Sequence, residues 1–221
     1  MKFKHFFPVC IFVLFLSTTA ESQVIVMGRP PRYRMRPPRQ KSRAQQLPKF
    51  QPSVDISAGY GFPNGDKDYI PTYYNAYNGS VSQTGPFAGS IDYHFQRNMS
   101  IGVLVTHGML KAPYYAYGNT SGVPDFNFNA SSWAVMLDIL HYIGATKNVT
   151  PYTRVALGFN IWDQNYTDAA GDKVSMPSAD LPDFAYQLSL GAKFRLSKNS
   201  SLFLEAGYGK YIVNGGLSFK F

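Results

Sequence analysis

The sequence predicts an all-β fold: an eight-stranded antiparallel up-and-down transmembrane β-barrel over residues 50–221, preceded by a disordered or extended basic N-terminal arm. Three observations carry this prediction. Apolar and polar residues alternate along eight short segments, the connections between the segments alternate in length, and the charged residues gather on the polar face. Beyond the first twenty residues, no apolar run approaches the roughly 18 residues of a membrane-spanning helix, which excludes a helical membrane bundle.

Residues 1–20 have the three-part layout of a secretory signal peptide. Lys2 and Lys4 precede an apolar stretch over 6–16, and small residues follow over 17–20. The only cysteine, Cys10, lies in the apolar stretch and is removed with it. The mature chain is therefore expected to contain no disulfide and no thiol chemistry.

Residues 21–49 form a Pro/Arg-rich arm. The formal net charge of the whole chain is +8, but residues 28–49 hold eight basic residues and no acid, while residues 50–221 hold 11 basic and 12 acidic residues. Because the basicity belongs to the arm, the charge does not indicate a nucleic-acid partner. Repulsion between like charges and two Pro-Pro pairs prevent this segment from forming a packed core. It is either a solvated linker or an arm that docks on a partner, and the sequence does not decide between the two. The residues of a docking arm are Arg29, Arg32, Arg34, Arg36, Arg39, Lys41 and Arg43.

Strict alternation begins after Phe50 and is typical of strands with two different faces. In the first segment, Val54 and Ile56 lie on one face and Asp55 and Ser57 on the other. The eight segments are 53–62, 87–95, 99–106, 133–143, 153–161, 183–196, 202–209 and 213–221. The segment 133–143 also fits a helical stripe, so that alternative stays open for it.

The connections alternate in length along the chain. The long ones are 63–85, 108–130 and 163–182, the short ones are 96–98, 144–148 and 197–200, and the seventh is a tight turn near Gly209 and Lys210. Bacterial outer-membrane barrels show this asymmetry, with long external loops and short periplasmic turns. An even number of strands then leaves both the N- and C-termini in the periplasm.

The two faces differ in charge, and this decides which one points outward. The apolar face is almost free of charge, as lipid requires, whereas a soluble barrel would turn its large apolar residues inward. Eight strands leave a lumen that side chains can fill, so the polar face predicts a lumen plugged by a charge network. That network consists of Asp55, Asp92, Asp138, Arg154, Lys193, Arg195, Glu205 and Lys220. Aromatic belts at the membrane interfaces are expected from Tyr60, Phe62, Phe87, Tyr93, Phe95, Trp133, Tyr208 and Tyr211.

No catalytic, metal or cofactor site is expected. His94, His107 and His141 fall at different heights of the predicted barrel and do not meet a serine. The aspartates of the long connections show no regular spacing of calcium ligands. We therefore expect no enzyme activity, no metal and no cofactor.

The C-terminal segment 215–221 ends in alternating apolar residues, and Val149-Thr150-Pro151-Tyr152 opens a strand that contains Gly158. In these features, and in its signal peptide, the chain resembles small outer-membrane β-barrel proteins of Gram-negative bacteria. This family includes the transmembrane domain of outer-membrane protein A and the barrels common in Bacteroidetes. The resemblance implies that Leu217, Phe219 and Phe221 form the signal that the barrel assembly machinery recognises during insertion. Peptidoglycan anchoring is not implied, because no peptidoglycan-binding domain is expected after the last strand.

The predicted function is that of a structural or partner-binding component of the outer membrane, an accessory subunit of an outer-membrane complex. Its expected partners are outer-membrane lipid and lipopolysaccharide, the assembly machinery, and an outer-membrane or periplasmic protein. Two alternatives stay open: a channel for small solutes or hydrophobic compounds, and an enzyme that modifies lipid A.

Overall fold

A computed structural model describes residues 50–70, 81–116, 119–120, 122–144, 146, 148–176 and 178–221. The predicted signal peptide (1–20) and Pro/Arg-rich arm (21–49) lie outside the described residues. None of the helical residues that the structure describes belongs to a helix of sufficient length and apolar character to span a bilayer.

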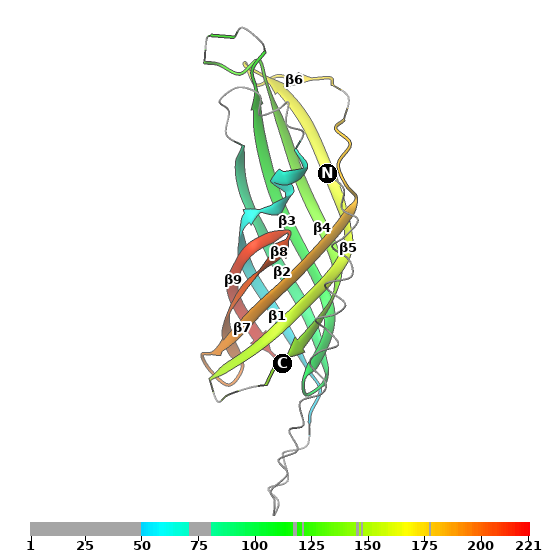
Figure 1. The fold of residues 1–221 in the computed structure, drawn as a ribbon, viewed down its shortest axis with the longest axis vertical. Coiled ribbons are helices and arrows are strands. Elements are labelled where there is room, and N and C mark those ends of the chain that lie inside the picture. The colour runs from blue at the N-terminus through cyan, green and yellow to red at the C-terminus, as the bar shows by residue number, and fades with distance from the viewer. Residues whose placement is uncertain are drawn as a thin grey trace, which may run out of the picture. The chain divides into compact units, whose positions relative to one another are not determined.

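Eight strands form one closed antiparallel sheet, which confirms the predicted fold class (Figure 1). They are β1 (Ser53–Asn64), β2 (Ser82–Gln96), β3 (Met99–Tyr114), β4 (Phe126–Tyr142), β5 (Val149–Asp168), β7 (Phe184–Arg195), β8 (Ser200–Gly209) and β9 (Tyr211–Lys220). A short 3-10 helix, η1 (Gly65–Tyr69), follows β1, and the two-residue strand β6 (Lys173–Val174) pairs only with β5. Each of the eight strands pairs with its neighbours in chain order, so the topology is up-and-down.

The barrel closes between its first and last strands. β1 and β9 pair from Asp55–Lys220 to Asn64–Tyr211. The amide of Val54 donates to the carbonyl of Phe221 at 3.0 Å, and the amide of Phe221 donates back at 2.8 Å. Closure removes the sheet edges and pairs backbone groups between strands, as a sheet in hydrocarbon requires.

Apolar side chains cover the outside of the barrel, and its inside is filled by polar side chains together with apolar ones such as Leu104, Met136 and Leu140. Ile91 and Leu137 are 58% and 59% exposed, whereas their neighbours Asp92 and Asp138 are completely buried. This inside-out arrangement suits lipid as the surrounding solvent, so the chain is a transmembrane β-barrel. The segment 133–143 lies in and just after strand β4, which settles it as strand rather than helix.

The apolar belt has the height of a bilayer core. Along β4 and one residue beyond it, the belt runs from Trp133 to Ile143, both of which are at least half exposed. Ten residue steps of about 3.3 Å, at a strand tilt of about 40°, give a height of about 25 Å. The turns after β2, β4 and β7 and Phe221 lie at one end of the barrel, the turn end. The longer connections and the tight β8–β9 turn lie at the other, the loop end.

Strands β2 to β5 continue past the belt at the loop end, while the β8–β9 hairpin stops lower (Figure 1). The predicted connections were therefore too long: the one expected at 108–130 is confined to 115–125, and the one expected at 163–182 starts at 169. Beyond the belt, the two faces of the strands exchange character. On β4, Asn127 and Asn129 point outward, while Phe128 and Ala130 are buried on the inner side.

The inward apolar residues of these extensions form a small core at the loop end. η1 and the segment before β7 pack over it and contribute residues of their own. Its buried members are Ile70, Leu110, Ala112, Phe128, Ala130, Tyr166 and Leu181. Outside the bilayer, the surrounding solvent is water, so burial of apolar residues on the inner side becomes favourable again.

Candidate functional site

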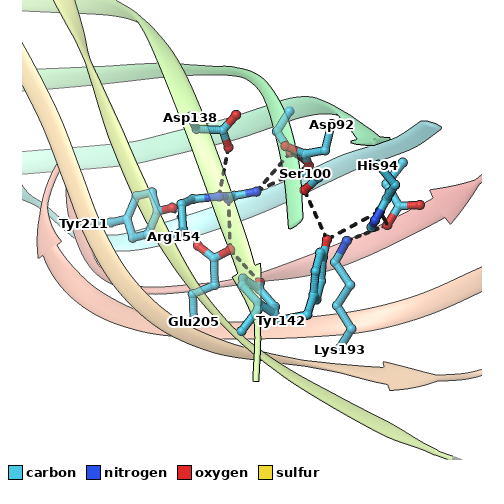
Figure 2. Close-up of polar contacts among 12 residues, drawn as sticks. Asp92, His94, Ser100, Asp138, Tyr142, Arg154, Lys193, Glu205 and Tyr211 are labelled. Carbon is cyan, nitrogen blue, oxygen red and sulfur yellow. Dashed lines mark hydrogen bonds and ion pairs between the residues drawn. The ribbon is translucent and has the colours of Figure 1, made fainter. Parts of the chain in front are cut away.

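The lumen is built around one buried arginine. Strand β5 directs Arg154 inward, because its sequence neighbours Thr153 and Val155 occupy the outward face. The guanidinium contacts carboxylates of two further strands (Figure 2): its Nε lies 3.1 Å from Asp138 Oδ2 on β4, and its Nη1 lies 2.9 Å from Glu205 Oε1 on β8. Arg154 therefore links β5 to its neighbour β4 on one side and to β8, the second strand on the other side.

A third carboxylate, Asp92 of β2, lies 3.5 Å from Nη2 of Arg154. Ser90 joins this side of the cluster: it accepts a hydrogen bond from Nη2 of Arg154 at 3.2 Å and donates one to Asp92 at 2.9 Å. One buried guanidinium thus faces three buried carboxylates. Oδ1 atoms of Asp92 and Asp138 have no hydrogen-bond partner among the described residues.

Two tyrosines complete the shell of Glu205. The hydroxyl of Tyr152 donates to Oε1 at 2.6 Å, and the hydroxyl of Tyr211 donates to Oε2 at 2.7 Å. Tyr211 was expected in an interfacial belt, but it is completely buried in the lumen. Ile212 and Val213 are both exposed, so the alternation of β9 breaks between them, and Tyr211 falls on the inner face together with Asn214.

Glycines on the inner face make room for these large groups. A Cβ added to Gly191 would lie 2.7 Å from the ring of Tyr152 and 2.8 Å from Glu205. A Cβ added to Gly102 would lie 2.5 Å from Oδ1 of Asp92 and 2.8 Å from Oδ1 of Asp138. The small inward residues are therefore a condition for filling the lumen with charged side chains.

A second cluster connects β1, β2 and β7. The ammonium of Lys193 lies 2.7 Å from Oδ2 of Asp55, and Nε2 of His94 lies 3.1 Å from the same oxygen. The ring of Tyr142 stacks on His94 and lies 5.7 Å from the Lys193 ammonium, a cation–π distance. Ser100 of β3 lies 3.5 Å from the Tyr142 hydroxyl.

A third cluster closes the lumen toward the loop end. Lys210, in the tight β8–β9 turn, reaches Oδ1 of Asp66 at 2.5 Å and Oδ1 of Asn160 at 2.9 Å. Ser132 donates a hydrogen bond to the other carboxylate oxygen of Asp66. Asn64 caps η1 by accepting from the Asp66 amide at 3.1 Å. Sequence analysis missed this cluster because neither Lys210 nor Asp66 belongs to an alternating segment.

The eight predicted lumen residues separate into two groups. Six lie buried in the clusters described above: Asp55, Asp92, Asp138, Arg154, Lys193 and Glu205. The other two, Arg195 and Lys220, are exposed and have no ion pair among the described residues. Each is the last residue of its strand, at the turn end, where an inward-facing position already opens to water.

The predicted assembly signal also has a defined place in the structure. Leu217, Phe219 and Phe221 lie on the outward face at the end of the chain, and Phe221 is 73% exposed. The basic residues of the arm, 29–43, lie outside the described residues.

The geometry shows no assembled nucleophile or metal cage in the described part of the chain. His94 contacts Asp55 and Tyr142, but none of its contacts there is with a serine. His107 stacks on Trp133 on the outward face, and His141 is exposed. Among the described residues, no group of three His, Cys, Asp or Glu side chains is placed to hold a metal ion.

No family model and no curated protein matches the chain. Several solved structures of outer-membrane barrels are similar to it. Ail, the attachment invasion locus protein of Yersinia pestis, is 12% identical over 77% of this chain and 97% of Ail, with a TM-score of 0.40. OprG of Pseudomonas aeruginosa is 11% identical over 76% and 95%, with a TM-score of 0.42. The N-terminal barrel domain of OprF from the same organism is 17% identical over 76% and 97%, with a TM-score of 0.38.

Proposed function

We propose that this protein is a non-enzymatic integral component of the outer membrane, an accessory subunit of an outer-membrane complex that acts as a closed scaffold. The observation that carries the proposal is the filled lumen. Every barrel strand contributes a side chain to its contacts, from Asp55 on β1 and Ser100 on β3 to Tyr211 on β9. Such a barrel presents surfaces to partners rather than a path for solutes.

Planar-bilayer recording tests the closed lumen directly. The full mature protein is expected to leave the bilayer silent, because the Arg154 and Lys210 clusters occupy the lumen at two levels. Steady single-channel steps from the wild-type protein would overturn the scaffold function in favour of the channel alternative. An empty bilayer treated with the same detergent is the control.

The orientation is part of the proposal. The loop end faces the outside of the cell, and the turn end, with Phe221 and the start of β1, faces the periplasm. This follows the usual asymmetry of outer-membrane barrels, in which long connections are external. The arm then lies in the periplasm, where seven basic residues suit an acidic protein surface or acidic headgroups.

Co-purification tests the arm. Replacement of Arg29, Arg32, Arg34, Arg36, Arg39, Lys41 and Arg43 by glutamine keeps the length and prolines of the arm and removes its charge. We expect normal membrane insertion and weaker recovery of periplasmic partners from native membranes, as for deletion of 28–49. Unchanged recovery in both variants would remove the arm from the proposal.

Assembly and catalysis each have a separate test. Phe221→Ala is expected to slow insertion by the assembly machinery, whereas Leu137→Ala, at an equally apolar outward position, is expected to leave recognition unchanged.

Lipid A from a deletion strain is expected to keep its acyl pattern. An altered pattern that wild-type protein restores, but a His94→Ala variant does not, would support the enzyme alternative.

A further inference from the structure

The outward face of β2 to β5 changes from apolar to mostly polar beyond the last row of the belt. His107, Trp133 and Ile161 lie side by side in register in the last row of the belt. The next row contains Ser131 paired with Asp163, and the row after it contains Asn129 paired with both Lys111 and Asn165. Met109 of β3 also lies in the first of these rows, paired with Ser131 and 45% exposed, so one apolar side chain accompanies the polar ones beyond the aromatic edge.

These two rows enclose a hollow of about 290 Å³ on the outside of the sheet. Leu110 and Ala130 form its floor with their backbone, because their side chains point into the loop-end core. The volume lies at the lower limit of small-ligand sites. A hollow on this face is separate from the lumen and from all three charge clusters.

Most polar groups of the hollow are free to bind a ligand. Lys111 and Asp163 form no ion pair with any described residue, and the side chains of Asn165 and Ser131 form no hydrogen bond with one. Asn129 donates to Thr167 at 3.2 Å, which orients its amide on the sheet. The hollow therefore offers an ammonium, a carboxylate, amides and a hydroxyl within one small area.

The position of the hollow along the barrel axis indicates which part of the membrane it faces. It opens sideways from the barrel wall, immediately beyond the row of Trp133, where the apolar belt ends. Aromatic rows of this kind mark the boundary between hydrocarbon and headgroups. What lies beside the barrel at this height is the headgroup layer of the surrounding leaflet.

The chemistry of the hollow narrows the choice of headgroup. One lysine and one aspartate give no net charge, so a headgroup held by charge alone is a poor match. Amides, a hydroxyl and a carboxylate complement the alternating donors and acceptors of sugar hydroxyls, and a single ammonium complements one phosphate. We propose that the hollow over Lys111, Asn129, Ser131, Asp163 and Asn165 binds the phosphorylated-sugar headgroup of a glycolipid of the outer leaflet. This rests on the proposed orientation, with the loop end outward.

Native mass spectrometry of the full mature protein released from micelles tests the site. The probes are bis-phosphorylated lipid A, dephosphorylated lipid A and phosphatidylglycerol. We expect one retained lipid A, with about tenfold preference over phosphatidylglycerol, because several hydrogen bonds distinguish them. Equal retention of phosphatidylglycerol and both forms of lipid A would overturn the proposal.

Variants separate the sugar and phosphate contacts. Asn165→Leu is expected to reduce retention of both forms of lipid A by about tenfold, whereas Lys111→Met should affect only the phosphorylated form. Matched controls are Asn127→Leu, one row beyond the hollow on β4, and Lys173→Met on β6, and both should retain lipid A as the wild type does. Equal loss in the variants and controls would also overturn the site.

Orientation is measured independently of lipid binding. Thr120→Cys, in the connection between β3 and β4, is expected to react with a membrane-impermeant maleimide on intact cells. A lack of labelling on intact cells, with full labelling after lysis, would overturn the proposed orientation. Loss of lipid A selectivity with normal labelling would instead overturn the headgroup site alone.

Discussion

Removal of the Arg154 charge is expected to be the most damaging single change in the lumen. Arg154→Met keeps a long apolar stem but leaves Asp92, Asp138 and Glu205 without their shared cation. Arg154 and its partners are at most 3% exposed, so water cannot replace the lost contacts. Breaking a buried ion pair by removing one partner costs about 3–5 kcal/mol. The unfolding equilibrium should therefore shift by roughly a hundredfold to several thousandfold.

Urea unfolding in lipid vesicles, followed by tryptophan fluorescence and circular dichroism, measures this cost. Arg195→Met is the matched control, because it is the same chemical change at an exposed position, where the effect should stay within about 0.5 kcal/mol. Adding Glu205→Gln to Arg154→Met should recover part of the loss by removing one uncompensated charge. Equal costs for Arg154→Met and Arg195→Met would refute the central role of Arg154.

Three further changes test other parts of the structure. Gly191→Ala places a Cβ 2.7–2.8 Å from lumen side chains and should destabilise the barrel by about 1–3 kcal/mol. Gly89→Ala is the control, because the nearest atom to its added Cβ is 3.8 Å away, and it should lower the free energy of unfolding by less. The midpoints of urea unfolding compare the two variants. Leu137→Arg should cost about 2–4 kcal/mol in the belt, and Asn127→Arg, outward on the same strand but beyond it, about 0–1 kcal/mol; similar values would contradict the position of the membrane edge. Hydrogen bonds from the backbone amide of Ala116 and the side chain of Asn119 lower the pKa of Asp125. These contacts should therefore persist below the ordinary carboxyl pKa and be lost only as pH falls through the lowered pKa. Amide hydrogen exchange in this connection measures the loss, and exchange that does not change across this pH range would argue against the contact.

The part of the fold inside the bilayer was accessible from sequence because lipid and lumen impose opposite demands on successive residues. Ile91 beside Asp92, and Leu137 beside Asp138, are the pattern in its simplest form. The same alternation predicted six of the charged residues of the lumen. It did not predict which of them form ion pairs with one another, because the sequence of one strand does not indicate which carboxylate of another strand an arginine will contact.

The sequence did not predict the structure correctly where a strand passes from lipid into water. Phe128 and Ala130 point inward although apolar residues a few positions later on the same strand point outward, so a search for one continuous apolar face ends at the boundary. Lys210 and Asp66 were missed for another reason. Their contact depends on a tight turn and a short helix, and neither carries a periodic signal.

The contact between Lys210 and Asp66 joins residues 144 positions apart and so links the first connection of the chain to the last hairpin. It requires that β9 already lies beside β1, since only then are both groups at the same rim. Closure of the barrel and this contact therefore depend on the same strand pairing, so a change that separates β1 from β9 would also part the Lys210 ammonium from Asp66.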